Sequence, residues 1–283
     1  MRRWLQFLTL CICLLAAASV SRAADTVNLR FGGSREAVRY AVHTDAVQRT
    51  SAGVFRLSAD YEAWWQPLKP VPSGQTPVLV TLGPGKGTVT GDAGATRLSW
   101  NYTGRSLVPL WSLESRIVDM LLELPEPAGG GAVDALAAYV HAGWSIVLPG
   151  RPVAPGETWV VDVADEPSPT GKVLTTRRVV GTLERVGEVA GRRVAYVSGE
   201  MDQRTVPDHP TLRGSASVRV DSAFELDGGR LLASRIVETS DVTVAAGASQ
   251  GTSVRTDPLE CTIRIPDGPA VDPVIRGAEG GRS

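Results

Sequence analysis

The stretch SASVRVDSAFELDGGRLLASRIVETSDVTV, residues 215–244, decides the fold class of this chain. Apolar and polar residues alternate through Ser215–Leu226, so that Val220 and its apolar neighbours share one face while Arg219 lies on the other. This period of two predicts a half-buried strand. Asp227–Gly229 then reverses the chain, because an aspartate followed by glycine favours a hairpin turn, and Leu231–Val244 follows as a second strand. The stretch therefore predicts an antiparallel hairpin.

The same alternation recurs along most of the chain. The further predicted strands are Val38–His43, Phe55–Glu62, Val78–Leu82, Arg97–Tyr102, Trp159–Val163, Lys172–Leu183, Val194–Ser198 and Leu259–Ile265. The 30 glycines and 19 prolines supply turns between them, and we interpret Gly83–Gly87 as one such hairpin turn. Successive strands joined by short turns form an antiparallel meander. About ten strands in one sheet would curl toward a half-barrel.

Residues 110–142 depart from this pattern. Apolar side chains recur there at helical spacing, at Leu110, Leu113, Ile117, Met120, Leu121 and Leu124. Pro125 would end this helix, and Val133–Ala142 predicts a shorter second one. The expected fold is therefore mainly β: a curved antiparallel meander sheet or half-barrel with two mid-chain helices covering one face.

The first residues predict export. A basic start at Arg2 and Arg3 precedes the apolar run Phe7–Val20, and Ser21–Ala23 resembles a cleavage site, so residues 1–23 are interpreted as a signal peptide. No stable membrane span is expected after its removal. Cleavage takes three arginines with it and lowers the formal net charge from −1 to −4. The rest is expected to form one β-rich domain, 24–266 (helical insertion about 110–142), and a disordered tail, 267–283, in the periplasm or outside the cell.

Known catalytic and metal-binding motifs are missing from the sequence. His43, His141 and His209 are widely spaced, and the lysine in Gly83–Gly87 lacks the spacing of a phosphate-binding loop. Cys261, the one cysteine outside the predicted signal peptide, lies in an alternating run and is expected to face the core. We therefore expect no enzyme activity, no cofactor and no metal. The near-neutral charge argues against nucleic acid as a partner.

A short motif carries a resemblance. Pro152–Trp159, PVAPGETW, resembles a P-V-x-x-G-[DE]-[TS]-W element of uncharacterised exported bacterial β-rich proteins, and the likeness extends over residues 148–244. Such proteins are compared in architecture with lipoprotein-carrier-like folds, in which a curved sheet covered by helices holds acyl chains. The resemblance implies this architecture for the present chain and carries no catalytic residue with it.

Two functional hypotheses follow. In the first, an exported non-catalytic protein binds a lipid or other apolar small molecule between sheet and helices, with a cavity lined by Trp65, Trp111, Leu113, Ile117, Met120, Leu121, Leu124 and Trp144. In the second, the core is fully packed and the chain is a structural or protein-interaction module of the bacterial cell envelope, with envelope proteins as partners. Trp64, expected to point outward beside an inward Trp65, would then belong to the interaction surface.

Overall fold

The computed structural model describes most of the chain. The described residues are 26–30, 34–72, 76–101, 106–107, 109–111, 117–120, 148–164, 175–205, 212–244 and 252–273. Within these ranges the regular structure is entirely β. None of the described segments is an apolar helix long enough to cross a membrane.

The strands are long for a globular domain, and most of those in the main sheet have 13 to 16 residues. Their bounds are β1 Val27–Asn28, β2 Val38–Thr50, β3 Gly53–Pro67, β4 Thr76–Gly91, β5 Gly94–Asn101, β6 Ser106–Leu107, β7 Pro109–Trp111, β8 Ile117–Met120, β9 Pro152–Val153, β10 Thr158–Ala164, β11 Thr175–Val189, β12 Arg192–Thr205, β13 Leu212–Glu225, β14 Arg230–Val244 and β15 Thr252–Arg264.

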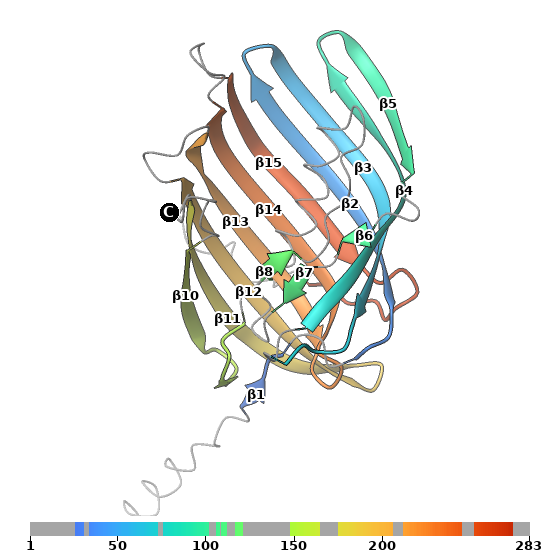
Figure 1. Ribbon diagram of the computed structural model, residues 1–283, viewed down its shortest axis with the longest axis vertical. Coiled ribbons are helices and arrows are strands. Elements are labelled where there is room, and N and C mark those ends of the chain that lie inside the picture. Colours follow the sequence, from blue (N-terminus) through green and yellow to red (C-terminus); the bar gives the residue numbers. More distant parts are fainter. Residues whose placement is uncertain are drawn as a thin grey trace, which may run out of the picture.

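Thirteen of these strands form one antiparallel sheet. Its order is β10-β11-β12-β13-β14-β15-β2-β3-β4-β7-β8, with β5 and β6 also paired to β4. The strands β10–β15 pair in sequential order, as do β2–β4, which continue through β7 to β8, and the pairing of β15 with β2 joins the two halves. Figure 1 shows the sheet curling so strongly that β7 and β8, at one end of this order, overlap β12–β14 in the view. The predicted antiparallel meander is therefore confirmed.

Alternation gives the sheet an inner and an outer face. The inner face carries the main core, which runs from Trp159 on β10 to Val80 on β4. The small β1–β9 pair packs onto this core through Val27 and Val153. Trp65 and Cys261, both predicted to point inward, lie on this face at 2% exposure each. The outer face is the one that carries His43 and Arg219 and is mostly polar.

A smaller apolar cluster lies on the outer face. It consists of Val194, Tyr196, Ala223 and Leu232, and Ile265 and Val271 pack against it. The segment after β15 therefore runs back over the outer face, held by a hydrogen bond from the Ile265 amide to the Leu232 carbonyl (3.3 Å). We call residues 265–273 the strap.

The two predicted mid-chain helices are not supported. Pro109–Trp111, at the start of the first predicted helix, and Ile117–Met120, inside it, are the antiparallel strands β7 and β8. The strand β7 also pairs with Thr76 and Pro77 of β4. The apolar spacing fitted a helix, but β-branched Ile117 and Val118 also suit a strand, and pairing with β4 satisfies backbone groups that a sequence pattern does not reveal. The second predicted helix, 133–142, lies outside the described residues.

The predicted turn at Gly83–Gly87 is also wrong. These residues lie within β4, which continues to Gly91 before the chain turns. Their glycines permit close packing instead of chain reversal. A Cβ at Gly87 would lie 2.8 Å from the Ser58 carbonyl oxygen, and one at Gly83 would lie 2.5 Å from Cζ3 of Trp64.

Candidate functional site

A row of small side chains crosses the middle of the inner face. The row has one residue on each strand, and each residue lies directly opposite the next one on the neighbouring strand. From β11 to β4 the residues are Gly181, Gly199, Val220, Ile236, Cys261, Thr44, Ala59 and Gly87. Apart from Val220 and Ile236, none is larger than threonine. At Gly181 the ring of Trp159 packs against the backbone, where a Cβ would lie 2.4 Å from the ring.

Three polar groups lie in or beside this row. Thr44 and Cys261 are directly opposite each other on β2 and β15, and Tyr61 lies diagonally across on β3. Their exposures are 1%, 2% and 7%. Burial raises the pKa of the Cys261 thiol to about 11 and raises the pKa of Tyr61 well above its usual value, and the nearby Thr44 hydroxyl offsets part of both shifts.

Two of these groups have no hydrogen-bond partner among the residues that the structure describes. The Thr44 hydroxyl lies close enough to influence Tyr61 and Cys261, but among the described residues neither Thr44 Oγ1 nor the Tyr61 hydroxyl meets the geometry of a hydrogen bond. A buried polar atom left unpaired costs about 1–3 kcal/mol. Such atoms in an apolar wall are what a ligand site offers to the polar group of its ligand.

Glu238 adds a carboxyl group to the same face. It lies opposite Leu259 on β15, one inner-face step along β14 from Ile236, which pairs with Cys261. The residue is 8% exposed, and burial raises the pKa of its carboxyl group, against a hydrogen bond from Ser240 that lowers it. A raised pKa favours the protonated form, which can donate a hydrogen bond.

The residues predicted to line a cavity lie in different parts of the chain's structure. Trp65 lies on the inner face, edge-on to Tyr40 with 6.2 Å between ring centroids, and the Tyr40 hydroxyl donates to the Leu231 carbonyl (2.9 Å). Trp111 is in β7, and Ile117 and Met120 are in β8. The other four, Leu113, Leu121, Leu124 and Trp144, lie outside the described residues.

Trp64, the predicted interaction residue, lies on the outer face and is half-buried. Its ring packs over Gly83 of the neighbouring strand β4, so closely that a Cβ at Gly83 would lie 2.5 Å from Cζ3 of the ring. Part of this ring is therefore covered within the sheet itself.

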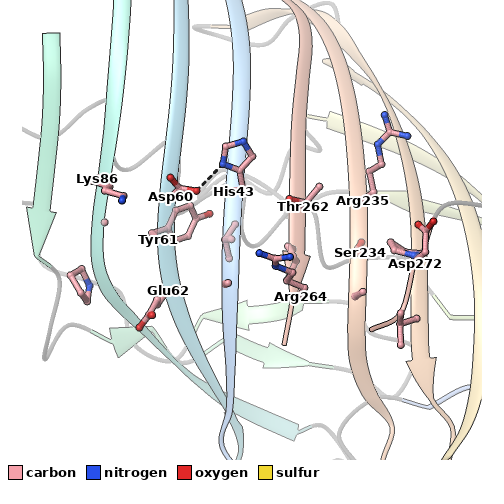
Figure 2. Close-up of a pocket in the computed structure, with 18 residues that line it drawn as sticks. His43, Asp60, Tyr61, Glu62, Lys86, Ser234, Arg235, Thr262, Arg264 and Asp272 are labelled. Carbon is pink, nitrogen blue, oxygen red and sulfur yellow. Dashed lines mark hydrogen bonds and ion pairs between the residues drawn. The ribbon is translucent and has the colours of Figure 1, made fainter. Parts of the chain in front are cut away.

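A groove of about 890 Å³ opens on the outer face, between strands β4 and β14 and the strap (Figure 2). Its floor includes Ala41 and Ala233, which flank Arg264 in register. One cross-strand row borders the groove, and Figure 2 shows its side chains next to one another on successive strands: Lys86, Asp60, His43, Thr262 and Arg235.

Most charged side chains that line this groove form ion pairs. His43 Nδ1 is 2.8 Å from Asp60, and His43 Nε2 is 2.9 Å from Asp45. The hydrogen bond to Asp60 is the main cause that raises the pKa of His43. Arg235 pairs with Glu260 at 2.7 Å. Exposed Lys86 and Arg264 form no ion pair with any other described residue.

Sequence reasoning missed Thr44, Tyr61 and Glu238 as site residues. A signal for Thr44 was present, because it occupies an inward position of the alternation that Val38 begins. The proximity of Thr44 to Cys261 had no such signal, since it depends on the pairing of β2 with β15 from the other end of the chain. Likewise, alternation placed His43 beside Asp45 but could not show Asp60 across the hairpin.

No family model matches this chain, and no curated protein does. Among solved structures, an outer membrane channel from Pseudomonas putida F1 aligns at 10% identity over 85% of this chain and 97% of that chain, with a TM-score of 0.27. A domain from Vibrio parahaemolyticus, described as an outer membrane lipoprotein-sorting protein domain, aligns at 7% identity over 78% and 84%, with a TM-score of 0.14. Similarity this low gives no basis for transferring fold or function.

Proposed function

We propose that this chain is an exported, non-catalytic binding protein that holds a lipid or other apolar molecule against the inner face of its half-barrel. The observation that carries the proposal is the pair of buried hydroxyl groups, Thr44 and Tyr61, which have no hydrogen-bond partner among the described residues. The wall around them is apolar, and the row they adjoin is made mostly of small side chains. A mostly apolar wall with a few polar atoms is typical of small-molecule sites.

Extraction of the protein from its native host tests this function directly. Protein purified without detergent is extracted with organic solvent, and the extract is analysed by mass spectrometry. We expect a stoichiometric amphiphile. An extract that contains none, together with no binding of added lipid, contradicts the proposal.

Two conservative variants connect the ligand to the site. Thr44→Val and Tyr61→Phe each remove a hydroxyl and keep the shape of the side chain, so each should weaken ligand retention by up to about tenfold, the value of one hydrogen bond. Thermal stability should stay unchanged or rise, because an unpaired buried hydroxyl is lost. Tyr196→Phe is the matched control, since Tyr196 lies on the outer face beneath Arg185. Equal retention in all three variants would exclude the hydroxyl groups as ligand contacts.

The outer groove supports a second candidate function, that of a protein-interaction module of the cell envelope. Its volume of about 890 Å³, together with Lys86 and Arg264, which form no ion pair within the described ranges, offers a partner an open, partly charged surface. Crosslinking in cells followed by pull-down distinguishes the two functions. A partner that is lost in Lys86→Glu and Arg264→Glu, while lipid retention is unchanged, supports the module. The same comparison with Trp64→Ala tests whether the surface extends to that ring.

A further inference from the structure

Arg264 lies in the middle of the groove on the outer face, with small neighbours on both sides. Ala41 on β2 and Ala233 on β14 are directly opposite it, so no long side chain lies beside it in the register. Figure 2 shows its guanidinium group among the labelled side chains of the groove. The side chain is exposed and makes no hydrogen bond or ion pair with any residue in the described ranges. The donors of its guanidinium group are therefore available to a ligand.

Thr262 adds a hydroxyl group beside this cation. The two residues are two positions apart on β15, so their side chains share the outer face and lie about 7 Å apart along the strand. The half-buried Thr262 side chain has no hydrogen-bond partner within the described part of the chain. A ligand oxygen between the two residues can accept hydrogen bonds from both.

The carboxylates that line the groove lie beside cations of their own. These pairs are Asp60 with His43, Glu62 with Arg39, and Asp272 near Arg235. Lys86 has no ion pair in the part of the chain that the structure describes, but it is three strands away from Arg264, about 14 Å at roughly 4.8 Å per strand. Among the described side chains, the centre of the groove therefore presents Arg264 as a single free cation, which suits a ligand with one negative charge.

The surfaces next to Arg264 are apolar. Ala41 and Ala233 form the floor on either side of it, and Val271 and Pro273 of the strap also line the groove. The volume of about 890 Å³ lies in the range of small-molecule sites, about 300–1,000 Å³. The groove can therefore cover a flat apolar group while the guanidinium binds an anionic one.

We propose that this outer groove binds a small monocarboxylate with an apolar body. The carboxylate accepts hydrogen bonds from the Arg264 guanidinium and the Thr262 hydroxyl, and the body lies over Ala41 or Ala233 against the strap. A guanidinium presents its donors as a flat fork that matches the two oxygens of a carboxylate. The site lies on the opposite face of the sheet from the buried hydroxyls Thr44 and Tyr61, so it is independent of the function proposed above.

Benzoate and 2-naphthoate, which carry a smaller and a larger apolar body, are the probes. NMR titration of the purified full chain at pH 7 measures their affinity, and we expect saturable binding of one molecule per chain. 2-Naphthamide has the body without the charge and acetate has the charge without the body, so each should bind at least about tenfold more weakly than 2-naphthoate. Absence of saturable binding for both probes overturns the proposal. Tighter binding of 2-naphthyl phosphate than of 2-naphthoate overturns the choice of a carboxylate.

Variants of Arg264 connect the probe to the site. Arg264→Gln should lower the affinity for 2-naphthoate at least about tenfold, the loss expected for a hydrogen bond to a charged group. Arg264→Lys keeps the charge without the fork and should lose several-fold. Because Arg264 is exposed and has no ion pair in the described ranges, both variants should keep the melting temperature of the natural chain.

Arg49→Gln is the matched control, because Arg49 is exposed on the outer face of β2 and lies outside the groove. Equal losses in Arg49→Gln and Arg264→Gln would show a general effect of charge and overturn the site. Unchanged affinity in Arg264→Lys would overturn the role of the fork.

Two further comparisons separate this site from the other candidate functions. Thr44→Val, on the inner face, should leave the binding of 2-naphthoate unchanged, and a loss equal to that of Arg264→Gln would overturn the outer site. Thr262→Val should weaken binding about three- to tenfold, the value of one hydrogen bond. A protein partner that crosslinks through the groove, while neither probe binds, would overturn the proposal in favour of the interaction module.

Discussion

At the scale of single residues, His43 is the histidine of the described part of the chain, and its charge should respond to pH near neutrality. Both ring nitrogens contact carboxylates, at 2.8 Å and 2.9 Å, and carboxylates only accept hydrogen bonds, so both nitrogens carry protons. The pKa of His43 is raised, chiefly by Asp60. The protonated imidazole of His43 therefore stabilises the folded protein fully below the pKa of about 6.5 that it has in the unfolded chain. This stabilisation is lost as the pH rises through the higher pKa that His43 has in the folded protein.

We expect the melting temperature to fall as the pH rises from about 6.5 through the raised pKa of His43, and His43→Gln to remove this part of the fall. The His43 side chain is 43% exposed, so solvent screening keeps the effect small. Thermal melts of both proteins across that range measure it, and an NMR titration of the imidazole protons locates the pKa. An equally steep fall in the variant would show that other groups cause it.

Glu238 should affect the pH dependence of stability in the opposite direction to an ion-paired carboxylate. Burial raises its pKa, so the folded protein holds the proton more tightly than the unfolded chain. Stability is then lost as pH rises from about 4.5 through the folded pKa. Glu238→Gln should stabilise the protein at pH 7, where the buried carboxyl group of Glu238 is costly to ionise, and should give no gain at pH 4, where that carboxyl group is protonated in both states.

Urea unfolding at the two pH values measures the gain. Glu200→Gln is the control, because Glu200 is exposed on the outer face. A gain at pH 7 that persists at pH 4 would mean that protonation of Glu238 is not its cause.

At the scale of elements, the contact between β3 and β4 depends on a glycine under a tryptophan. A Cβ at Gly83 would lie 2.5 Å from Cζ3 of Trp64, closer than real side-chain contacts allow. Gly83→Ala should therefore destabilise the fold by about 1–3 kcal/mol. In a Trp64→Ala background the same change should cost much less, because the ring is absent. A double-mutant cycle by urea unfolding checks this, and additive costs would contradict the contact.

The elements also show how far sequence reasoning reaches. Long strands such as β2 and β13 repeat the period of two often enough to fix both the strand and its faces, as buried Trp65 and Cys261 show for their own strands. The strands β7 and β8, with three and four residues, are too short to display a period, and their apolar spacing also fits a helix. The glycines of Gly83–Gly87 led to the prediction of a turn, because glycine is common in turns. In the structure they lie within β4 and allow close contact with Trp64 and Ser58 of β3. The inner-face site needed the pairing of β15 with β2, which no local pattern encodes.

At the scale of the whole molecule, that pairing holds the two meanders together. Thr44 and Cys261 are directly opposite across it, and opposite residues in an antiparallel pair have Cα atoms about 4.5–5.5 Å apart, within the range for a disulfide. Thr44→Cys should therefore crosslink with Cys261 under oxidising conditions. The bond would close a loop of about 200 residues and stabilise the fold by about 5 kcal/mol in the chain-entropy description.

Non-reducing electrophoresis and mass spectrometry detect the bond, and melts with and without reductant measure its effect. Thr44→Ser, which cannot crosslink, is the control. If the folded variant formed no disulfide under oxidising conditions, this would contradict the register of β2 with β15.

The strand order has a consequence for how the chain could be rewired. Apart from β15–β2, each neighbouring pair of long strands in the sheet is also a neighbouring pair along the chain. A circular permutant that joins the end of the strap to the start of β2, and opens the chain between β8 and β10, would turn this one distant pairing into a local hairpin. Lower contact order speeds folding, so such a permutant should refold faster than the natural order while keeping the same sheet.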